Sequence, residues 1–360
     1  MAGMRARRFV LTVATAVAAA ALLGGCAVNE QGDRESDLSG VLDGAGSSAQ
    51  GAAQDAWIAG FQRANAGVTV NYDPAGSGAG REQFIVGAVD YAGSDTPLTI
   101  DETEGPLERC AEGSGAINLP VYLSPIALAF NIEGVDRLQL DAASVARIFT
   151  GEIERWNDPD LVRLNPDVTL PDARITPVHR SDDSGTTENF TEYLAEAAPE
   201  QWPDEPDDAF PYEGEAAQGN SGIVAVIRDG VNVIGYIDAS RSEGLDVASL
   251  IVGEQGVAPN AESASAIVDV SPMEPGRPDD DLVIDIDRGT SEPGVYPLVL
   301  VSYVIACREY RDPNDGELVR AYLQWVASAE GQEAAAADAG SAPISAALRE
   351  RVLAAVDAIR

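Results

Sequence analysis

The sequence contains no lysine, so all 23 of its basic residues are arginine. A P-loop, a Schiff base and a pyridoxal-phosphate site each need a lysine, and these three kinds of site are therefore excluded. Histidine occurs once, as His179, and cysteine three times, which offers no cluster of histidines and cysteines for a zinc site. We accordingly expect no metal and no cofactor.

Basic residues are also few relative to acids, because 23 arginines face 59 acidic residues and the formal net charge is −36. No basic patch is available to replace the counterions of nucleic acid, which excludes nucleic acid as a partner. The same field repels small anions. A protein of this charge that binds an anion must use short-range, buried donors, and the sequence should show such donors in clusters.

The N-terminal sequence is typical of a secretion signal. Three arginines precede an apolar stretch, residues 9–23, that is short for a membrane span. Small residues before Cys26 resemble a lipobox, in which the cysteine is lipidated; an ordinary signal peptide with a chance cysteine is the alternative. We predict a lipoprotein signal over residues 1–25 and a flexible tether over residues 26–40. Cleavage removes three arginines and no acid, so the mature charge would be −36 − 3 = −39.

Two further cysteines, Cys110 and Cys307, remain after cleavage. An exported protein meets an oxidising environment, where an even pair of cysteines suggests a disulfide. Two buried free thiols are the alternative. A bridge would join an early segment of the chain to a late one.

Strand-like and helix-like segments alternate along the chain, which favours an α/β fold. Residues 199–211 are rich in proline and acid and are expected to form a surface loop, and residues 253–281 a loop with a short helix. The expected helices are 49–61, 190–197, 223–227, 318–325 and 348–356, and the expected strands are 68–72, 124–131, 231–237 and 299–307.

Four short segments place small or hydroxyl residues before a helix, or a carboxylate after a strand. The first, residues 43–49, brings Ser47 or Ser48 to the start of a helix, whose free amides and dipole favour an anion. Taken alone, this segment is better explained as a plain helix cap after a glycine turn. The second, residues 73–80, is a glycine loop that includes Ser77. It lacks the spacing G-x-G-x-x-G, so a dinucleotide site is not expected.

The third segment, residues 90–97, places Asp95 where an anion would bind. An acid there suits a ligand that carries a proton, such as hydrogen phosphate, because the carboxylate can accept that proton in a hydrogen bond. Sulfate has no proton to offer and would be repelled. An ordinary aspartate in a turn before proline is the alternative.

The fourth segment, residues 180–187, gathers the most donors. It combines hydroxyls, amides at a helix start and the planar fork of Arg180, which can hold two oxygens of an oxyanion. Asp182 is placed to hold the guanidinium through a second salt bridge. This density of donors exceeds what helix capping requires. The predicted donors are Arg180, Ser184, Gly185 and Thr186.

The sequence offers little support for an enzyme. His179 is close in sequence to Ser184 and Asp182, but neighbours this close rarely reach the geometry of a catalytic triad. The G-x-S-x-G nucleophile elbow is also absent. We therefore do not expect an enzyme, and a secreted phosphatase-like enzyme is kept as the alternative from another class.

Taken in order, these segments resemble the phosphate-binding lipoproteins of ABC-type (Pst) phosphate importers, from about Val41 to the C-terminus. One departure is Ala49, where many relatives carry a larger residue, often Phe; the contact expected there is through the backbone amide. The matching blocks are G-A-G-S-S, G-S-G-A-G, D-Y-A-G-S-D-T-P, G-E-I-E-R-W-N-D, R-x-D-x-S-G-T and Q-G-N-S-G-I.

The resemblance implies a two-lobed type II periplasmic-binding-protein fold, an α/β architecture whose chain crosses the hinge twice. We place the crossings near residues 119–125 and 297–302. Lobe I would comprise residues 41–122 and 302–360, and lobe II residues 123–301, which puts both Cys110 and Cys307 in lobe I.

The resemblance also implies the function. A monomer, lipid-anchored on the extracytoplasmic face of the membrane through Cys26, would capture inorganic phosphate between its lobes and deliver it to an ABC permease in the membrane. Tungstate, molybdate and arsenate are the alternative ligands within this class. The contacts carried over by motif are Ser48, the amide of Ala49, Ser77, Asp95, Arg180, Ser184, Gly185 and Thr186, with Asp182 behind Arg180.

Overall fold

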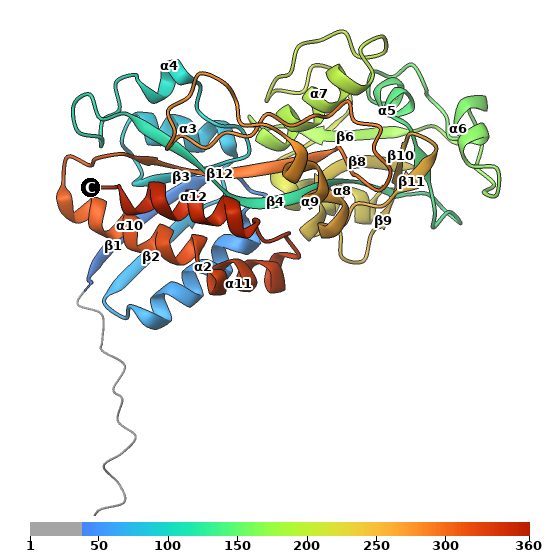
Figure 1. The fold of residues 1–360 in the computed structure, drawn as a ribbon. Helices are drawn as coiled ribbons and strands as arrows, with labels where there is room; N and C mark the ends of the chain where they lie inside the picture. The colour runs from blue at the N-terminus through green and yellow to red at the C-terminus, as the bar shows by residue number, and fades with distance from the viewer. Residues whose placement is uncertain (1–37) are drawn as a thin grey trace, which may run out of the picture.

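A computed structural model describes residues 38–360 of the chain. The predicted signal over residues 1–25, the predicted lipidation site Cys26 and the predicted tether as far as residue 37 lie outside the described residues. The described part forms two lobes joined by a long shared sheet (Figure 1). The expected α/β class and two-lobed architecture are confirmed.

The first strands of this sheet are parallel and belong to lobe I. β1 (Gly40–Gly46) lies between β2 (Val68–Asp73) and β3 (Tyr91–Ser94). Parallel neighbours bring their carboxyl ends to the same edge of the sheet, where α/β proteins place ligands. Three of the four candidate segments extend past the carboxyl ends of these three strands, and the topology therefore gathers their last residues at one edge.

Two long strands connect the lobes. β4 (Ala116–Asn131) is buried at every residue except the last, and it pairs antiparallel with β12 (Val299–Cys307) as far as Pro125. From Ile126 onward β4 pairs instead with β8 (Val233–Asp238), which belongs to lobe II. Figure 1 shows β4 and β12 running side by side from one lobe into the other. The predicted residue boundaries of the lobes remain a proposal.

The sheet continues into lobe II through parallel strands. β8 pairs with β6 (Thr176–Arg180), and β6 pairs with β7 (Glu215–Ala217). Arg180 is the last residue of β6, so the strand delivers the fourth candidate segment to the cleft side of lobe II. Within residues 38–360 a smaller three-stranded sheet follows the order β11 (Gln255–Val257), β10 (Ser249–Val252), β5 (Gln139–Leu140), while β9 (Asp246–Val247) pairs with β4.

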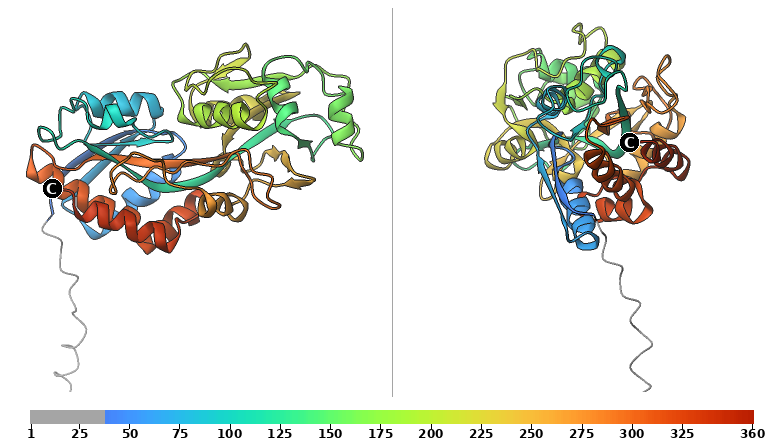
Figure 2. Two further views of the ribbon diagram at one scale, coloured as in Figure 1. Left: turned by 45° about the horizontal axis from the view of Figure 1, so that its top comes forward. Right: turned by 90° about the vertical axis from the view of Figure 1, so that its left-hand side faces the viewer.

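Helices cover the sheet of lobe I on both sides. In Figure 2, α3 and α4 lie on one side of it and α10 to α12 on the other. The predicted apolar stripe of the first helix is confirmed, because Trp57 and Phe61 are buried against the core. The helices of lobe I are α2 (Gly51–Ala64), α3 (Ser77–Ile85), α4 (Ile100–Thr103), α10 (Pro313–Ala327), α11 (Ala329–Ala339) and α12 (Ala346–Asp357).

Lobe II carries the remaining helices of the described chain. Ser184 caps α7 by accepting a hydrogen bond from the amide of Thr187, and Asp141 caps α5 in the same way through Ser144. These helices are α5 (Ala142–Phe149), α6 (Pro159–Leu164), α7 (Gly185–Ala197), α8 (Gly219–Asp229), α9 (Ala261–Val270) and the short 3₁₀ helix η1 (Ala239–Arg241).

Most local predictions agree with the structure, and the exceptions have physical causes. The strand expected over 124–131 is longer, because it also pairs with β12 as the connection between the lobes. The helix α11 was not predicted, since its alanine-rich sequence has no apolar stripe. Residues 199–211 form no helix or strand, as expected, although Trp202 within them is only 1% exposed.

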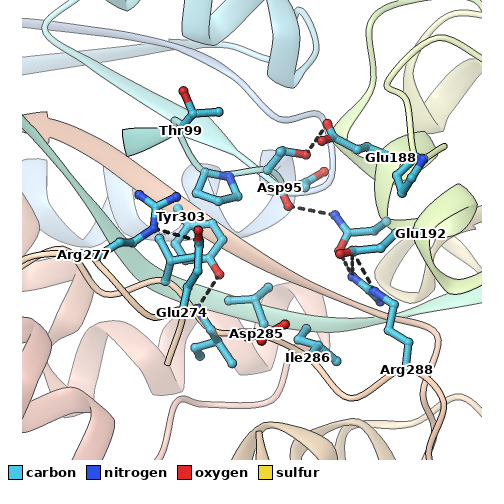
Figure 3. Close-up of a pocket in the computed structure, with 17 residues that line it drawn as sticks. Asp95, Thr99, Glu188, Glu192, Glu274, Arg277, Asp285, Ile286, Arg288 and Tyr303 are labelled. Carbon is cyan, nitrogen blue, oxygen red and sulfur yellow. Dashed lines mark hydrogen bonds and ion pairs between the residues drawn. The ribbon is translucent and has the colours of Figure 1, made fainter. Parts of the chain in front are cut away.

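A pocket of about 420 Å³ lies between the lobes on one side of Asp95. Lobe I contributes the segment from Asp95 to Pro97, and α7 of lobe II contributes Glu188 and Glu192. Figure 3 shows Arg277 and Arg288 at this pocket, each paired with an acid, Glu274 and Glu192 respectively. Both arginines at the pocket are therefore already held by acidic side chains of the protein.

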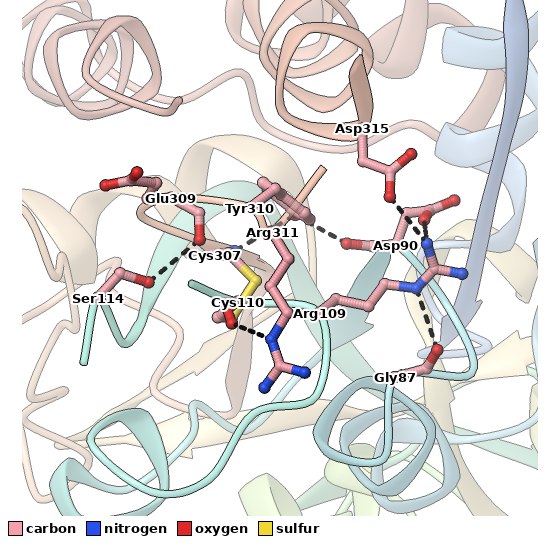
Figure 4. Close-up of a disulfide and its surroundings, with 10 residues drawn as sticks. All are labelled: Gly87, Asp90, Arg109, Cys110, Ser114, Cys307, Glu309, Tyr310, Arg311 and Asp315. Carbon is pink, nitrogen blue, oxygen red and sulfur yellow. Dashed lines mark hydrogen bonds and ion pairs between the residues drawn. A yellow bond between two sulfur atoms is a disulfide. The ribbon is translucent and has the colours of Figure 1, made fainter. Parts of the chain in front are cut away.

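The predicted disulfide between Cys110 and Cys307 is present, with its two Cα atoms 5.2 Å apart. It joins the chain after α4 to the last residue of β12, across 197 positions of sequence (Figure 4). Tyr310 lies beside it: the Tyr310 hydroxyl accepts a hydrogen bond from the Cys307 amide and donates one to the Asp90 carbonyl. The bridge therefore fixes the outer end of β12 to the body of lobe I.

Replacing both cysteines by serine should lower the free energy of unfolding by about 2–5 kcal/mol, because a long loop in the unfolded chain is no longer closed. Urea unfolding followed by circular dichroism measures this. Wild-type protein unfolded in the presence of a reductant is the matched control and should approach the variant. An unchanged unfolding midpoint in both would contradict the prediction.

Candidate functional site

The turn between β1 and α2 supplies the first group of polar atoms. Gly46 has a φ of +136°, and a Cβ atom there would lie 1.9 Å from the carbonyl oxygen of Gly93, so only glycine fits at the start of this turn. Ser47 Oγ then accepts hydrogen bonds from the amides of Ala49 (3.1 Å) and Gln50 (3.3 Å). The prediction that Ser47 or Ser48 caps this helix is wrong: the N-cap of α2 is Gln50, which makes no side-chain cap hydrogen bond, and Ser47 instead holds the turn before the helix.

Ser48 reaches across to lobe II instead. Its Oγ accepts hydrogen bonds from the side-chain Nδ2 of Asn220 (3.1 Å) and from the Asn220 amide (3.3 Å), at the start of α8. Ala49 is fully buried, and its amide bonds to Ser47. The first candidate segment thus contacts both the site and the opposite lobe.

The Asp95 carboxylate lies at the centre of the site and is only 3% exposed. Its Oδ1 accepts hydrogen bonds from Ser47 Oγ and Ser302 Oγ, both at 2.5 Å, and its Oδ2 accepts one from Thr186 Oγ1 at 3.2 Å. Its own amide donates to Ser77 Oγ (3.1 Å), which joins the second and third candidate segments.

Burial raises the pKa of Asp95, while its hydrogen bonds and the charge of a nearby guanidinium act in the opposite direction. The hydrogen bonds come from Ser302, Ser47 and Thr186, and the charge from Arg180. A buried carboxylate surrounded by hydroxyl donors is a strong hydrogen-bond acceptor, and it favours any ligand that brings a proton of its own.

Arg180 is held by two carboxylate oxygens. Its Nε donates to Asp182 Oδ1 at 2.8 Å and its Nη2 donates to Asp182 Oδ2, as predicted. Its Nη1 lies 3.5 Å from Thr186 Oγ1, toward the centre of the site. Asp182 also accepts a hydrogen bond from the Gly219 amide (3.0 Å). Burial opposes ionisation of Asp182, but these hydrogen bonds and the charge of Arg180 together lower its pKa.

The start of α7 packs directly against lobe I. A Cβ atom on Gly185 would lie 2.6 Å from Ser77 Oγ and 2.8 Å from Asp95 Cβ, so this position must be glycine for the lobes to approach. Ser184 is fully buried and accepts from the Thr187 amide through its Oγ at 3.2 Å. The structure therefore brings all the predicted site residues together, from both lobes.

Sequence reasoning missed Ser302 and Asn220 as parts of this site. Ser302 also accepts a hydrogen bond from Gln50 Nε2 at 2.7 Å, which fixes its hydroxyl beside Asp95. A single serine within the apolar run of residues 299–307 was a usable signal for it. Asn220 lies in a block that carried the family resemblance, but its role depends on its contact with Ser48 in the other lobe.

His179, the single histidine of the chain, and Trp156, from the block G-E-I-E-R-W-N-D, pack against other parts of the protein. His179 stacks on Phe210, with ring centroids 4.6 Å apart, and its Nδ1 lies 2.9 Å from the Arg180 carbonyl oxygen. Trp156 is fully buried.

Among residues 38–360, no three histidine, cysteine or acidic side chains are grouped so as to hold a metal ion. No helix in the same range is long and apolar enough to cross a membrane.

A second buried carboxylate, Asp238, lies near the point where the strands pass between the lobes. It is fully buried, and its Oδ1 accepts hydrogen bonds from the Tyr122 hydroxyl (3.1 Å) and the Ser240 amide (2.8 Å). Its amide donates to Asn220 Oδ1 at 2.8 Å, which connects it through Asn220 to Ser48. Burial raises the pKa of Asp238 to about 6, against the opposing hydrogen bonds.

The architecture and the site together define a class: a two-lobed binding protein whose cleft gathers hydroxyls, amides and one guanidinium around a carboxylate. A sequence model of the PBP superfamily domain matches residues 29–330. Phosphate-binding protein PstS 3 of Mycobacterium tuberculosis (strain ATCC 25618 / H37Rv) is 36% identical over 375 residues, which cover 99% of this chain and all of that protein. PstS 2 of the same strain is 37% identical over 328 residues, covering 88% and 87%. The chain belongs to the PBP superfamily, in the same family as these PstS proteins.

Solved structures support the fold assignment. A high-affinity periplasmic phosphate-binding protein (PfluDING), solved with bound phosphate, superposes with a TM-score of 0.70 at 23% identity, covering 88% of this chain and 93% of that one. A phosphate-binding protein from Stenotrophomonas maltophilia gives a TM-score of 0.65 at 19% identity, covering 88% and 94%. At these identities the likeness establishes the shared fold.

Asp238→Asn should change how stability depends on pH. The pKa of Asp238 is about 6 in the folded protein and about 4 in the unfolded chain. The folded protein therefore keeps its full free energy of unfolding below about pH 4, where the carboxyl is neutral in both states. Part of that free energy is lost as the pH rises through about 6, because the buried carboxyl must then ionise. The amide cannot ionise but keeps the Oδ1 acceptor. Relative to wild type, the variant should therefore gain on the order of 2 kcal/mol of unfolding free energy between pH 4.5 and pH 8.

Urea unfolding at the two pH values measures this difference. Asp246→Asn is the matched control, since Asp246 is exposed on the short strand β9 and undergoes the same chemical change. Parallel pH profiles for wild type and the Asp238 variant would refute the prediction.

Proposed function

We propose that this protein is an extracytoplasmic substrate-binding protein that captures inorganic phosphate between its lobes and delivers it to an ABC permease in the membrane. The observation that carries the proposal is the buried Asp95 carboxylate, surrounded by hydroxyl groups from three separate elements and by Arg180. The PstS relatives are named as phosphate-binding proteins, which points to the same ligand.

The proposed contacts divide into donors and one acceptor. Hydroxyls, helix-start amides and the Arg180 guanidinium donate to the oxygens of the anion, and charge-assisted bonds of this kind are the strong ones. Asp95 accepts the proton that phosphate carries at neutral pH. The proposed contact residues are Ser48, Ala49, Ser77, Asp95, Arg180, Ser184, Gly185 and Thr186, with Asp182 supporting Arg180 and with Ser47 and Ser302 supporting Asp95.

The mechanism follows from the division of these contacts between the lobes. Ser77 and Asp95 belong to lobe I, whereas Arg180, Ser184 and Thr186 belong to lobe II, so the donor shell is complete only when the lobes meet. Closure also removes water, which strengthens each charged hydrogen bond. An anchor on Cys26, which lies outside the described residues, would keep the protein beside the permease. Binding and release, without catalysis, are the proposed activity.

Phosphate should bind and sulfate should be rejected. In a thermal-shift assay of ligand-stripped protein, phosphate should raise the melting temperature, because a ligand that binds only the folded form stabilises it. Sulfate should have no effect at the same concentration. Asp95→Asn should lower the preference for phosphate over sulfate, measured as the ratio of the two affinities, by about 10-fold or more, because the charge that repels sulfate is removed.

Asp73→Asn is the matched control for this variant, because Asp73 is exposed at the end of β2 and the change in charge is the same. Molybdate, tungstate and arsenate complete the panel. Equal stabilisation of the wild type by sulfate, or by molybdate or tungstate, would overturn the assignment of Asp95 as the acceptor of a ligand proton.

Arg180→Ala should weaken phosphate binding by about 2–5 kcal/mol, the range typical of losing one partner of a buried, hydrogen-bonded charge pair. Isothermal titration calorimetry measures the change. Arg174→Ala is the control, because that side chain is 77% exposed just before the same strand, and its binding should equal that of wild type. An Arg180 variant that folds and binds with wild-type affinity would remove Arg180 from the site.

A further inference from the structure

The lobes also meet at a group of polar side chains that the proposed function does not use. Arg81 on α3 of lobe I donates from Nη2 to Asp208 Oδ2 of lobe II at 3.0 Å, and its Nη1 lies 3.7 Å from Glu188 Oε2. Thr96 of lobe I donates from Oγ1 to the same Glu188 oxygen at 2.7 Å. We call Arg81, Thr96, Glu188 and Asp208 the latch.

The latch lies one helical turn from the anion site on both sides of the cleft. Arg81 is four residues beyond Ser77, the first residue of α3, and Glu188 is three residues beyond Gly185, the first residue of α7. Residues at these spacings lie on one face of a helix. Because the two helix starts touch at Ser77 and Gly185, contact at the site and contact at the latch occur together.

Each remaining latch residue is also tied to a site residue. Thr96 follows Asp95 directly, and Figure 3 shows Glu188 pointing from α7 toward this segment. The backbone carbonyl of Asp208 accepts a hydrogen bond from the Ser184 amide at 2.9 Å, immediately before α7. The loop of residues 199–211, which carried no recognisable motif, therefore presents Asp208 to the opposite lobe from a position fixed by the site.

Charge gives the latch its energetic significance. Burial raises the pKa of Glu188, and the Thr96 hydrogen bond and the positive charge of Arg81 counteract that shift. Burial also raises the pKa of Asp208; Arg81 lowers it, and the nearby Asp183 raises it further. These side chains are between 17% and 27% exposed, so solvent screens their charges only partly. Both acids belong to lobe II, and Arg81 of lobe I is the cation that pairs with them from the opposite lobe.

We propose that Arg81 is a positioning residue for ligand capture: through Glu188 and Asp208 it holds the two lobes together over the bound oxyanion and so lengthens the time that the ligand stays bound. The inference rests on the proposed function. The latch joins residues of different lobes, so its free energy favours the closed form over the open one, and the apparent affinity changes by the shift in that equilibrium.

The test uses Arg81→Gln in the full mature chain, with phosphate as the ligand. The variant should bind phosphate about 5- to 100-fold more weakly, the range typical of coupling between distinct sites. Stopped-flow measurements should assign most of the loss to faster dissociation, because the latch forms after the anion has entered. Arg81→Lys keeps the charge and should restore part of the affinity. Circular dichroism establishes that each variant is folded.

A double-mutant cycle with Asp208→Asn separates the latch from general effects of charge. The two single variants should each weaken binding, and the double variant should lose clearly less than the sum of the two losses. Arg147→Gln is the matched control, since Arg147 pairs with Asp160 at 2.7 Å within lobe II and should leave binding unchanged. Additive losses, or wild-type affinity for Arg81→Gln, would overturn the proposal.

Small-angle X-ray scattering distinguishes failure of the latch from failure of the proposed ligand. If wild-type protein binds no anion of the panel, the proposed function is wrong, and the radius of gyration then decides the latch. A larger radius for Arg81→Gln than for wild type and Arg147→Gln would support a role in holding the lobes together. Equal radii would contradict it.

Discussion

The Asp95 carboxylate is the interaction on which the arrangement of the two lobes depends. It accepts hydrogen bonds from the turn before α2, from β12 and from the start of α7, and these elements come from both lobes and from the strand that joins them. A buried carboxylate is costly unless it is hydrogen-bonded or paired. Its three hydroxyl donors must therefore be correctly placed at the same time, which specifies how the lobes meet.

The net charge of −36 means that anion binding depends on this local arrangement. A long-range field of that sign opposes anion capture, and only donors within hydrogen-bonding distance can outweigh it. The structure uses acids to hold the arginines that provide positive charge. Asp182 fixes Arg180 at the site, and Asp208 fixes Arg81 one helical turn away. Each acidic partner restricts the conformations of its arginine side chain. A chain with a large excess of acidic residues can therefore still hold a guanidinium group in a fixed position.

The parts of the site that sequence could predict are those encoded by consecutive residues. Asp95, Arg180 and Gly185 lie in or directly beside short turns whose glycines and hydroxyls are visible as motifs. Ser302 could not be placed in this way, because its position beside Asp95 follows from the register of β12 against β3 and β4 and from the irregularity between Ser302 and Tyr303. The main strands and helices were predictable from apolar periodicity, whereas α11 lacks that signal.

Several contacts between the lobes lie next to the anion site, on more than one side of it. Ser48 reaches Asn220 at the start of α8, the Gly78 amide donates to the Asp183 carbonyl at 3.1 Å, and Arg81 reaches Asp208. Each contact begins within a few residues of a proposed ligand contact on one or both lobes. A ligand that pulls the helix starts together therefore forms these bonds with little further rearrangement. Conversely, an open cleft loses them all, so binding and lobe closure are energetically coupled through the residues next to the site.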